Sequence, residues 1–157
     1  MKKITLLLLL ATLIGFGACK KDNNTATPKS KKDLLTARVW KQTARTITPA
    51  IEVDGKLEND LFAHDDDCDK DDLYRYKSDN SFSFEEGAIK CSPTDPDIYD
   101  TGTWTFSTDE TKLILLYKSG DSYATTILEL TENTLKVSFE EEDGGVTYTT
   151  ITTYTAQ

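Results

Sequence analysis

The sequence predicts an all-β fold, an antiparallel sandwich or closed barrel of about eight strands that follows a short helical turn. Two observations carry this prediction. Short segments of alternating apolar and polar residues fill the chain after Val39, and turn signals such as Asp54-Gly55 and Asp143-Gly144-Gly145 separate them. Closure would remove exposed strand edges. A barrel of about eight strands is either filled by side chains or holds one small ligand.

The elements are expected in a simple order. Ser30 and Asp33 are placed to cap a helical turn that ends near Leu35. Strand patterns then cover residues 40–46, 51–53, 74–77, 81–85, 102–106, 113–117, 123–130, 135–140 and 146–155.

In the first strand, alternation places Trp40 and Gln42 on one face and Thr43 and Arg45 on the other. Pro49 is expected to end or bend this strand. A later hairpin is expected to join the strand patterns at residues 74–77 and 81–85. Asn80 lies in its turn and is suited to a left-handed backbone conformation.

The N-terminus reads as an export signal. Lys2 and Lys3 precede an apolar run over residues 4–18 that is too short to span a bilayer, so residues 1–18 are expected to be a signal peptide. Phe16-Gly17-Ala18-Cys19 resembles the lipobox of bacterial lipoproteins, which implies cleavage before Cys19 and lipidation of its thiol and amine. The alternative is an ordinary secretory peptide with a chance cysteine at its end.

The remaining chain divides into a tether over residues 19–30 and one domain over residues 31–157. Lipidation at Cys19, followed by Lys20, implies a lipid-anchored protein on the outer membrane of a Gram-negative cell envelope, facing the periplasm or the cell surface. Loss of residues 1–18, which include two lysines, takes the formal charge from −9 to −11. Such an acidic chain is not expected to bind nucleic acid.

Cys68 and Cys91 remain once Cys19 is lipidated, and an even pair in an oxidising compartment predicts a disulfide. The bond would close a loop of 24 residues and stabilise the fold by roughly 3–4 kcal/mol. A metal site that uses both thiolates with His64, or a pair of free thiols, is the alternative.

An acidic run covers residues 64–72. Its alternating carboxylates at Asp65, Asp67, Asp69 and Asp71 are candidate calcium ligands, because calcium takes six to eight oxygen ligands. The run lacks the glycine and glutamate positions of an EF-hand loop. A solvated acidic loop, or a docking patch for a basic partner, are the other interpretations.

Aromatic residues recur at alternating strand positions and are expected to point into one interior. They form either a packed core or an apolar pocket in which tyrosine hydroxyls orient a ligand. The candidate ligand-binding residues are Tyr74, Tyr76, Phe82, Phe84, Trp104, Phe106, Phe139 and Tyr148.

Catalysis finds little support in the sequence. His64 is the only histidine and lies in the charged run, and no nucleophile elbow or phosphate loop is present in the sequence. Adjacent Glu85 and Glu86 would face opposite sides of a strand. The protein is therefore expected not to be an enzyme and to use no cofactor.

Three stretches suggest a family: residues 34–41, which lead into Trp40, residues 74–79, and Gly102-Thr103-Trp104. With the two cysteines and the lipobox, residues 31–157 resemble the bacterial lipocalin-like domain lipoproteins. The resemblance implies an up-and-down β-barrel with an N-terminal lipid anchor. We therefore expect a membrane-anchored barrel that binds a small apolar or amphipathic molecule. The alternative is an envelope lipoprotein that binds another protein through its acidic loop, as an inhibitor or assembly factor.

Overall fold

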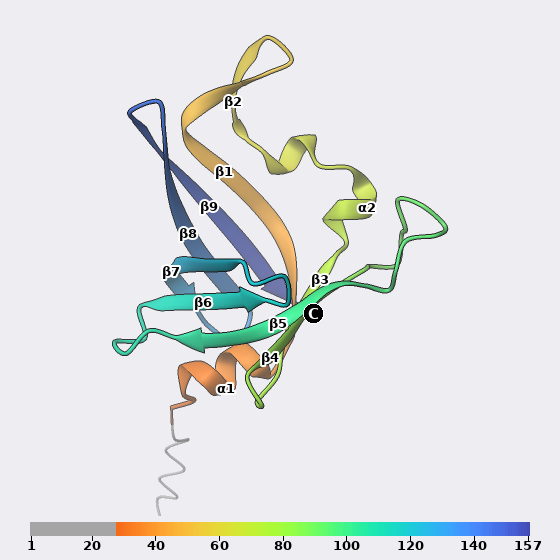
Figure 1. The fold of residues 1–157 in the computed structure, drawn as a ribbon, viewed down its shortest axis with the longest axis vertical. Helices are drawn as coiled ribbons and strands as arrows, with labels where there is room; N and C mark the ends of the chain where they lie inside the picture. The colour runs from red at the N-terminus through yellow and green to blue at the C-terminus, as the bar shows by residue number, and fades with distance from the viewer. Residues whose placement is uncertain (1–27) are drawn as a thin grey trace, which may run out of the picture.

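A computed structural model describes residues 28–157 as an antiparallel β-barrel with short helices (Figure 1). The predicted signal peptide, the predicted lipidation site at Cys19 and most of the predicted tether lie outside the described residues. The elements are, in chain order, α1 (Lys31–Thr36), β1 (Val39–Val53), β2 (Lys56–Asp60), η1 (Phe62–His64), α2 (Asp67–Lys70), β3 (Leu73–Tyr76), β4 (Ser81–Glu85), β5 (Ile98–Phe106), β6 (Lys112–Tyr117), β7 (Ser122–Leu130), β8 (Thr134–Asp143) and β9 (Val146–Ala156).

The strands follow one another around the barrel in an up-and-down order. β3 to β9 pair with their sequence neighbours, and β1 closes the ring by pairing with both β3 and β9. β2 is an additional strand that pairs with the far half of β1. The predicted closed antiparallel barrel of eight strands is therefore confirmed.

One side of the barrel is closed in an unusual way. β1 pairs with β3 only over Val39, Trp40 and Lys41, and its later residues pair with β2 instead. The segment that contains η1 and α2 lies beside β1 above β3 (Figure 1). At the start of this segment, the Leu61 N–H donates a hydrogen bond to the Arg45 carbonyl of β1 at 2.8 Å. This part of the wall is therefore made of loop and helix rather than of paired strands.

Helix α1 closes one end of the barrel, which we call the base. Ser30 and Asp33 form the predicted capping box. Leu35 is fully buried, and its carbonyl accepts a 2.8 Å hydrogen bond from the indole N–H of Trp40, which is also fully buried. Lys32 donates to the Asn80 side chain in the β3–β4 turn at 2.7 Å. The helix is therefore fixed to the core and to the turns around the base.

The hydrophobic core fills the half of the barrel next to the base. Aromatic and aliphatic side chains from most of the strands meet there, and their burial is the main source of stability. The core residues are Leu35, Trp40, Tyr76, Phe82, Trp104, Leu113, Leu135 and Val137.

Some strands differ from their predicted limits. β1 continues through Pro49, which lies in the irregular stretch where its pairing with β2 changes register between Thr46 and Ile51. β5 begins at Ile98, four residues before the predicted start at Gly102. Asn80 adopts the predicted positive φ, at 69°.

The predicted disulfide is confirmed. Cys68 in α2 and Cys91 in the β4–β5 loop are bonded, with their Cα atoms 5.2 Å apart. The bond ties the loop to the helical segment that replaces strand pairing beside β1.

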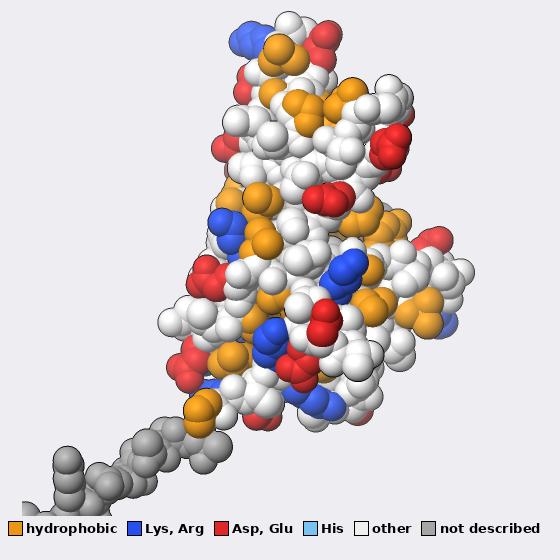
Figure 2. Space-filling view, turned by 90° about the vertical axis from the view of Figure 1, so that its left-hand side faces the viewer, with side chains coloured by type: hydrophobic (Ala, Val, Ile, Leu, Met, Phe, Trp, Pro, Cys, Tyr) orange, Lys and Arg blue, Asp and Glu red, His pale blue; other side chains and the backbone are white. Residues whose placement is uncertain are grey.

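The outer wall of the barrel is mixed in character. Figure 2 shows apolar side chains lying between acidic and basic ones on one face of the molecule. Leu57, Leu116 and Leu128 are among the large apolar residues that are exposed on the surface. Within residues 28–157, no helix has the length and apolar character needed to cross a membrane.

Candidate functional site: an acidic and aromatic cup

The barrel interior is packed near the base and open towards the other end. Two cavities, of about 340 Å³ and about 400 Å³, lie in the open half. They share Tyr74 and Phe84 as lining residues, so they adjoin each other. We call the two cavities together the cup. Their size is in the range that holds a small molecule.

The first cavity of the cup is polar. Its lining residues are Gln42, Arg45, Asp65, Asp69, Asp72, Tyr74 and Phe84. The guanidinium of Arg45 forms an ion pair with Asp65, and the Gln42 side-chain amide donates to the other carboxylate oxygen at 3.2 Å. Asp65 thus links the loop before α2 to β1.

A β-bulge brings Arg45 into this cavity. Gln42 pairs with Tyr154 of β9 but Ala44 pairs with Thr153, so Thr43 is an extra residue in β1. The bulge reverses the alternation, and Arg45 shares the interior face with Gln42. The prediction that they lie on opposite faces is therefore wrong.

The second cavity of the cup is aromatic. It is lined by Tyr74, Phe84, Tyr99, Asp100, Tyr117, Ser119, Asp121 and Tyr123. The Tyr74 and Phe84 rings stack with centroids 4.7 Å apart, and the Tyr117 and Tyr123 rings meet edge to face at 5.6 Å. Burial raises the pKa of Tyr74, so its phenol is neutral. The cavity therefore presents flat aromatic faces beside two carboxylates.

A second bulge places Tyr99 in this wall. Phe84 pairs with Asp100 and Glu85 pairs with Ile98, so Tyr99 is an extra residue in β5. Two consecutive side chains, Tyr99 and Asp100, consequently line one cavity. The Tyr99 ring lies against Phe84, with centroids 5.2 Å apart.

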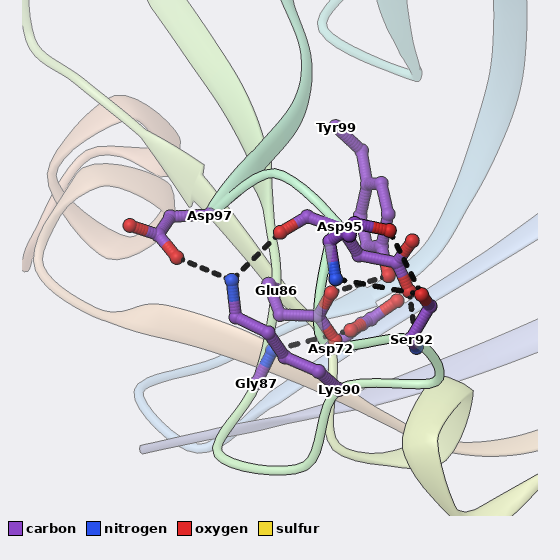
Figure 3. Close-up of polar contacts among 9 residues, drawn as sticks. Asp72, Glu86, Gly87, Lys90, Ser92, Asp95, Asp97 and Tyr99 are labelled. Atoms are coloured by element: carbon purple, nitrogen blue, oxygen red, sulfur yellow. Dashed lines mark hydrogen bonds and ion pairs between the residues drawn. The ribbon is translucent and has the colours of Figure 1, made fainter.

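Two buried carboxyl groups, those of Glu86 and Asp72, lie near Tyr99 of the aromatic cavity (Figure 3). Glu86 is 8% exposed and accepts a 2.5 Å hydrogen bond from the Tyr99 hydroxyl, while Asp72 is 5% exposed and accepts from the Gly87 N–H at 3.2 Å. Burial raises the pKa of Asp72 to about 6; the Gly87 hydrogen bond opposes this rise and repulsion by Glu86 adds to it. The hydrogen bond to Glu86 also raises the pKa of Tyr99, which keeps its phenol protonated.

The loop around this buried pair is held by its own polar contacts. Lys90 forms an ion pair with Asp97 at 2.7 Å and donates to the Asp95 carbonyl at 2.7 Å, as Figure 3 shows. The Ser92 N–H donates to the Asp95 carboxylate at 2.6 Å. Together with the disulfide at Cys91, these contacts hold the β4–β5 loop against the barrel.

The predicted aromatic residues divide between core and cavity. Tyr76, Phe82 and Trp104 are buried in the core, and Phe106 packs against it. Tyr74 and Phe84 line both cavities of the cup.

The last two candidates lie in the open half of the barrel. Phe139 lies near Tyr123, with ring centroids 6.5 Å apart. Tyr148 lines a separate cavity of about 270 Å³ with Ile47 and Ile51. The eight aromatic residues are therefore not brought together at one site.

Nine residues that line the cup were not among the predicted site residues: Gln42, Arg45, Asp72, Tyr99, Asp100, Tyr117, Ser119, Asp121 and Tyr123. Arg45 and Tyr99 depend on bulges that no local sequence signal marks. Tyr117 is the last residue of a segment, 113–117, that is apolar at both parities, so alternation predicted no single inward face. Tyr123 begins a predicted strand and its position beside the 119–121 turn was the available signal.

The four candidate calcium ligands hold different partners. Asp65 binds Arg45, exposed Asp67 lies 3.7 Å from Lys70, and Asp71 accepts from the Ala88 and Ile89 N–H groups. Asp69 lies 3.5 Å from the Cys91 sulfur. Among the residues described, the one group with metal-ligand spacing is Cys68, Asp69 and Cys91, in which both sulfurs are already bonded to each other. Calcium binding stays a prediction.

The comparisons with known proteins agree with this architecture. A family model described as a lipocalin-like domain matches residues 37–137, which run from the end of α1 into the first part of β8. No curated protein matches the chain. An eight-stranded closed barrel with an internal cup is the architecture expected from that match, and it suggests small-ligand binding. The chain belongs to the lipocalin-like domain family.

Proposed function

We propose that this protein is a lipid-anchored lipoprotein of a Gram-negative outer membrane whose barrel binds a small amphipathic molecule in the cup. The observation that carries the proposal is the pairing of a polar cavity with an aromatic one, joined at Tyr74 and Phe84. An amphipathic molecule can place its apolar body against the rings and its polar group beside Arg45 and the carboxylates.

Support for the anchor comes from the sequence and from the disulfide. The lipobox ends at Cys19, and the confirmed disulfide between Cys68 and Cys91 fits an exported protein. Two or more acyl chains on one cysteine would hold the protein stably on a membrane. Mass spectrometry of the protein from its own host tests this part. Unmodified Cys19 in the mature protein would contradict it.

Binding rather than catalysis is the proposed role of the cup. His64, the only histidine, is exposed on η1 and is not among the residues that line the cup. Native mass spectrometry of the protein purified from its host would reveal a retained small molecule. Recovery of a bound protein instead would favour the acidic-loop alternative.

A titration with N-phenyl-1-naphthylamine, a neutral dye that fluoresces in apolar sites, tests the cup directly. We expect saturable binding that weakens about tenfold in Phe84→Ala, because Phe84 lines both cavities. Leu116→Ala is the matched control, because Leu116 is exposed on the outer wall. Absence of saturable binding to the folded protein would overturn the proposal.

A further inference from the structure

We propose that the ligand of the cup carries a positive charge: an organic ammonium ion with an apolar body. This inference deepens the proposed function and rests on it. It follows from the charges that line the two cavities and from the kind of aromatic surface between them.

The cup is strongly acidic. Five carboxylates line it, at Asp65, Asp69, Asp72, Asp100 and Asp121, against one cationic side chain, Arg45. The Arg45 guanidinium is already paired with Asp65. An anionic ligand would therefore meet repulsion, and a neutral one would leave the other carboxylates without a counter-charge.

The aromatic cavity has the composition of a cation-binding box. Four tyrosines and Phe84 line it, and among the described residues no Lys or Arg contributes to its lining. The Tyr117 and Tyr123 rings pack edge to face against each other at 85°, so together they form one aromatic corner of the cavity wall. Aromatic faces attract ammonium groups through the ring quadrupole, which gives such a box a preference for cations.

Buried Glu86 strengthens this preference through Tyr99. It is 8% exposed, one of its oxygens accepts the Tyr99 hydroxyl, and its other oxygen has no hydrogen-bond partner among the described residues. Tyr99 lines the aromatic cavity, so the carboxylate acts on the cavity through the phenol that it holds. An acceptor on its hydroxyl makes the tyrosine ring richer in electrons, and the ring then attracts a cation more strongly.

The expected ligand class is therefore a primary amine or quaternary ammonium with an alkyl or aryl body. Its cationic group would lie among Tyr99, Tyr117 and Tyr123, near Asp100 and Asp121. Its body would extend past Tyr74 and Phe84, the two residues that both cavities share.

Three probes with the same tail and different charge test this inference: octyltrimethylammonium, octanol and octanoate. Isothermal titration calorimetry of the mature domain measures each affinity below micelle-forming concentrations. We expect the cation to bind at least tenfold more tightly than octanol, and octanoate to bind most weakly. If octanol or octanoate bound as tightly as the cation or more tightly, the proposal of a cationic ligand would be overturned, but the cup would still be a small-ligand site. Failure of all three to bind to the folded protein would overturn both proposals.

Charge-removing variants locate the cationic group. Asp100→Asn and Asp121→Asn keep an oxygen for the Thr101 N–H and the Ser119 hydroxyl, so both variants retain these hydrogen bonds. Each should weaken octyltrimethylammonium binding about fivefold and leave octanol binding unchanged. Asp66→Asn, on the exposed acidic run, is the matched control and should change neither. If both variants lost equal affinity for octyltrimethylammonium and for octanol, the site would not be specific for charge and the proposal would be contradicted.

Discussion

Arg45 of β1 forms an ion pair with Asp65 on the side of the barrel where β1 and β3 are not paired. The side chain of Asp65 is 16% exposed and that of Arg45 is 38% exposed. The pair therefore connects the helical segment to the sheet at the rim of the cup, where backbone hydrogen bonds between strands do not reach.

A double-mutant cycle should measure this connection. With Arg45→Ala, Asp65→Ala and the double variant, urea unfolding is expected to give a coupling free energy of about 1 kcal/mol, near the upper end for exposed pairs because Asp65 is mostly buried. Lys90 and Asp97 offer a matched control at 2.7 Å, with Asp97 fully open to solvent, and their coupling should be smaller. Equal coupling for both pairs would show that the Arg45 pair has no special structural role.

Removal of the disulfide should destabilise the fold. The bond closes a loop from Cys68 to Cys91, and its loss is expected to lower the free energy of unfolding by roughly 3–4 kcal/mol. Urea unfolding with and without reductant measures the change. The Cys68→Ser/Cys91→Ser variant is the control, because its stability should be unaffected by reductant. A wild-type protein that is equally stable in reductant would contradict the prediction.

Stability should fall between about pH 4 and pH 6 because of Asp72. Its pKa is raised to about 6 in the folded state from 3.8, so in this range the folded state binds more protons than the unfolded state. The free energy of unfolding therefore decreases as pH rises, by up to about 3 kcal/mol, and the decrease levels off about one pH unit above the folded-state pKa of Asp72. Thermal melts across this range of pH should show the decrease.

Asp72→Asn separates this effect from other titrations. Asn can still accept the Gly87 N–H, so the variant should keep the fold and lose that part of the pH dependence. Asp66→Asn, at an exposed position, should leave the dependence of stability on pH unchanged. If Asp72→Asn kept the whole decrease of stability with pH, that decrease would belong to another titrating group.

Gly102 is expected to tolerate no side chain. A Cβ atom there would lie 2.1 Å from the Leu116 carbonyl oxygen and 2.7 Å from a ring carbon of Phe82. Backbone of β6 must shift to admit it, so Gly102→Ala should lower the free energy of unfolding by about 2 kcal/mol. Thr103→Ala, exposed on the same strand, is the control and should have a smaller effect. A neutral Gly102→Ala variant would show that β5 and β6 separate easily.

Alternation and turn residues predicted the barrel well because they are local. Phe82 and Phe84 point inward as their spacing requires, and Asn80 turns the chain between β3 and β4. The cup was less predictable, because extra residues at Thr43 and Tyr99 change which side chains face it. A bulge depends on how two strands distant in sequence pair, so the pattern of one strand does not reveal it. Whether an inward-facing aromatic residue lies in the core or in the cup also depends on distant parts of the chain. Tyr76, Phe82 and Trp104 are buried in the core because α1 closes the base beside them.

The position of α1 also bears on how a ligand would reach the protein. The chain enters the barrel at the base, where α1 lies (Figure 1). The cup lies in the other half of the barrel. A lipid on Cys19 would then direct the base to the bilayer, with residues 19–30 spanning at most roughly 40 Å when fully extended. The cup would open towards water, so exchange would favour molecules that are dissolved in the surrounding fluid over those that diffuse within the lipid.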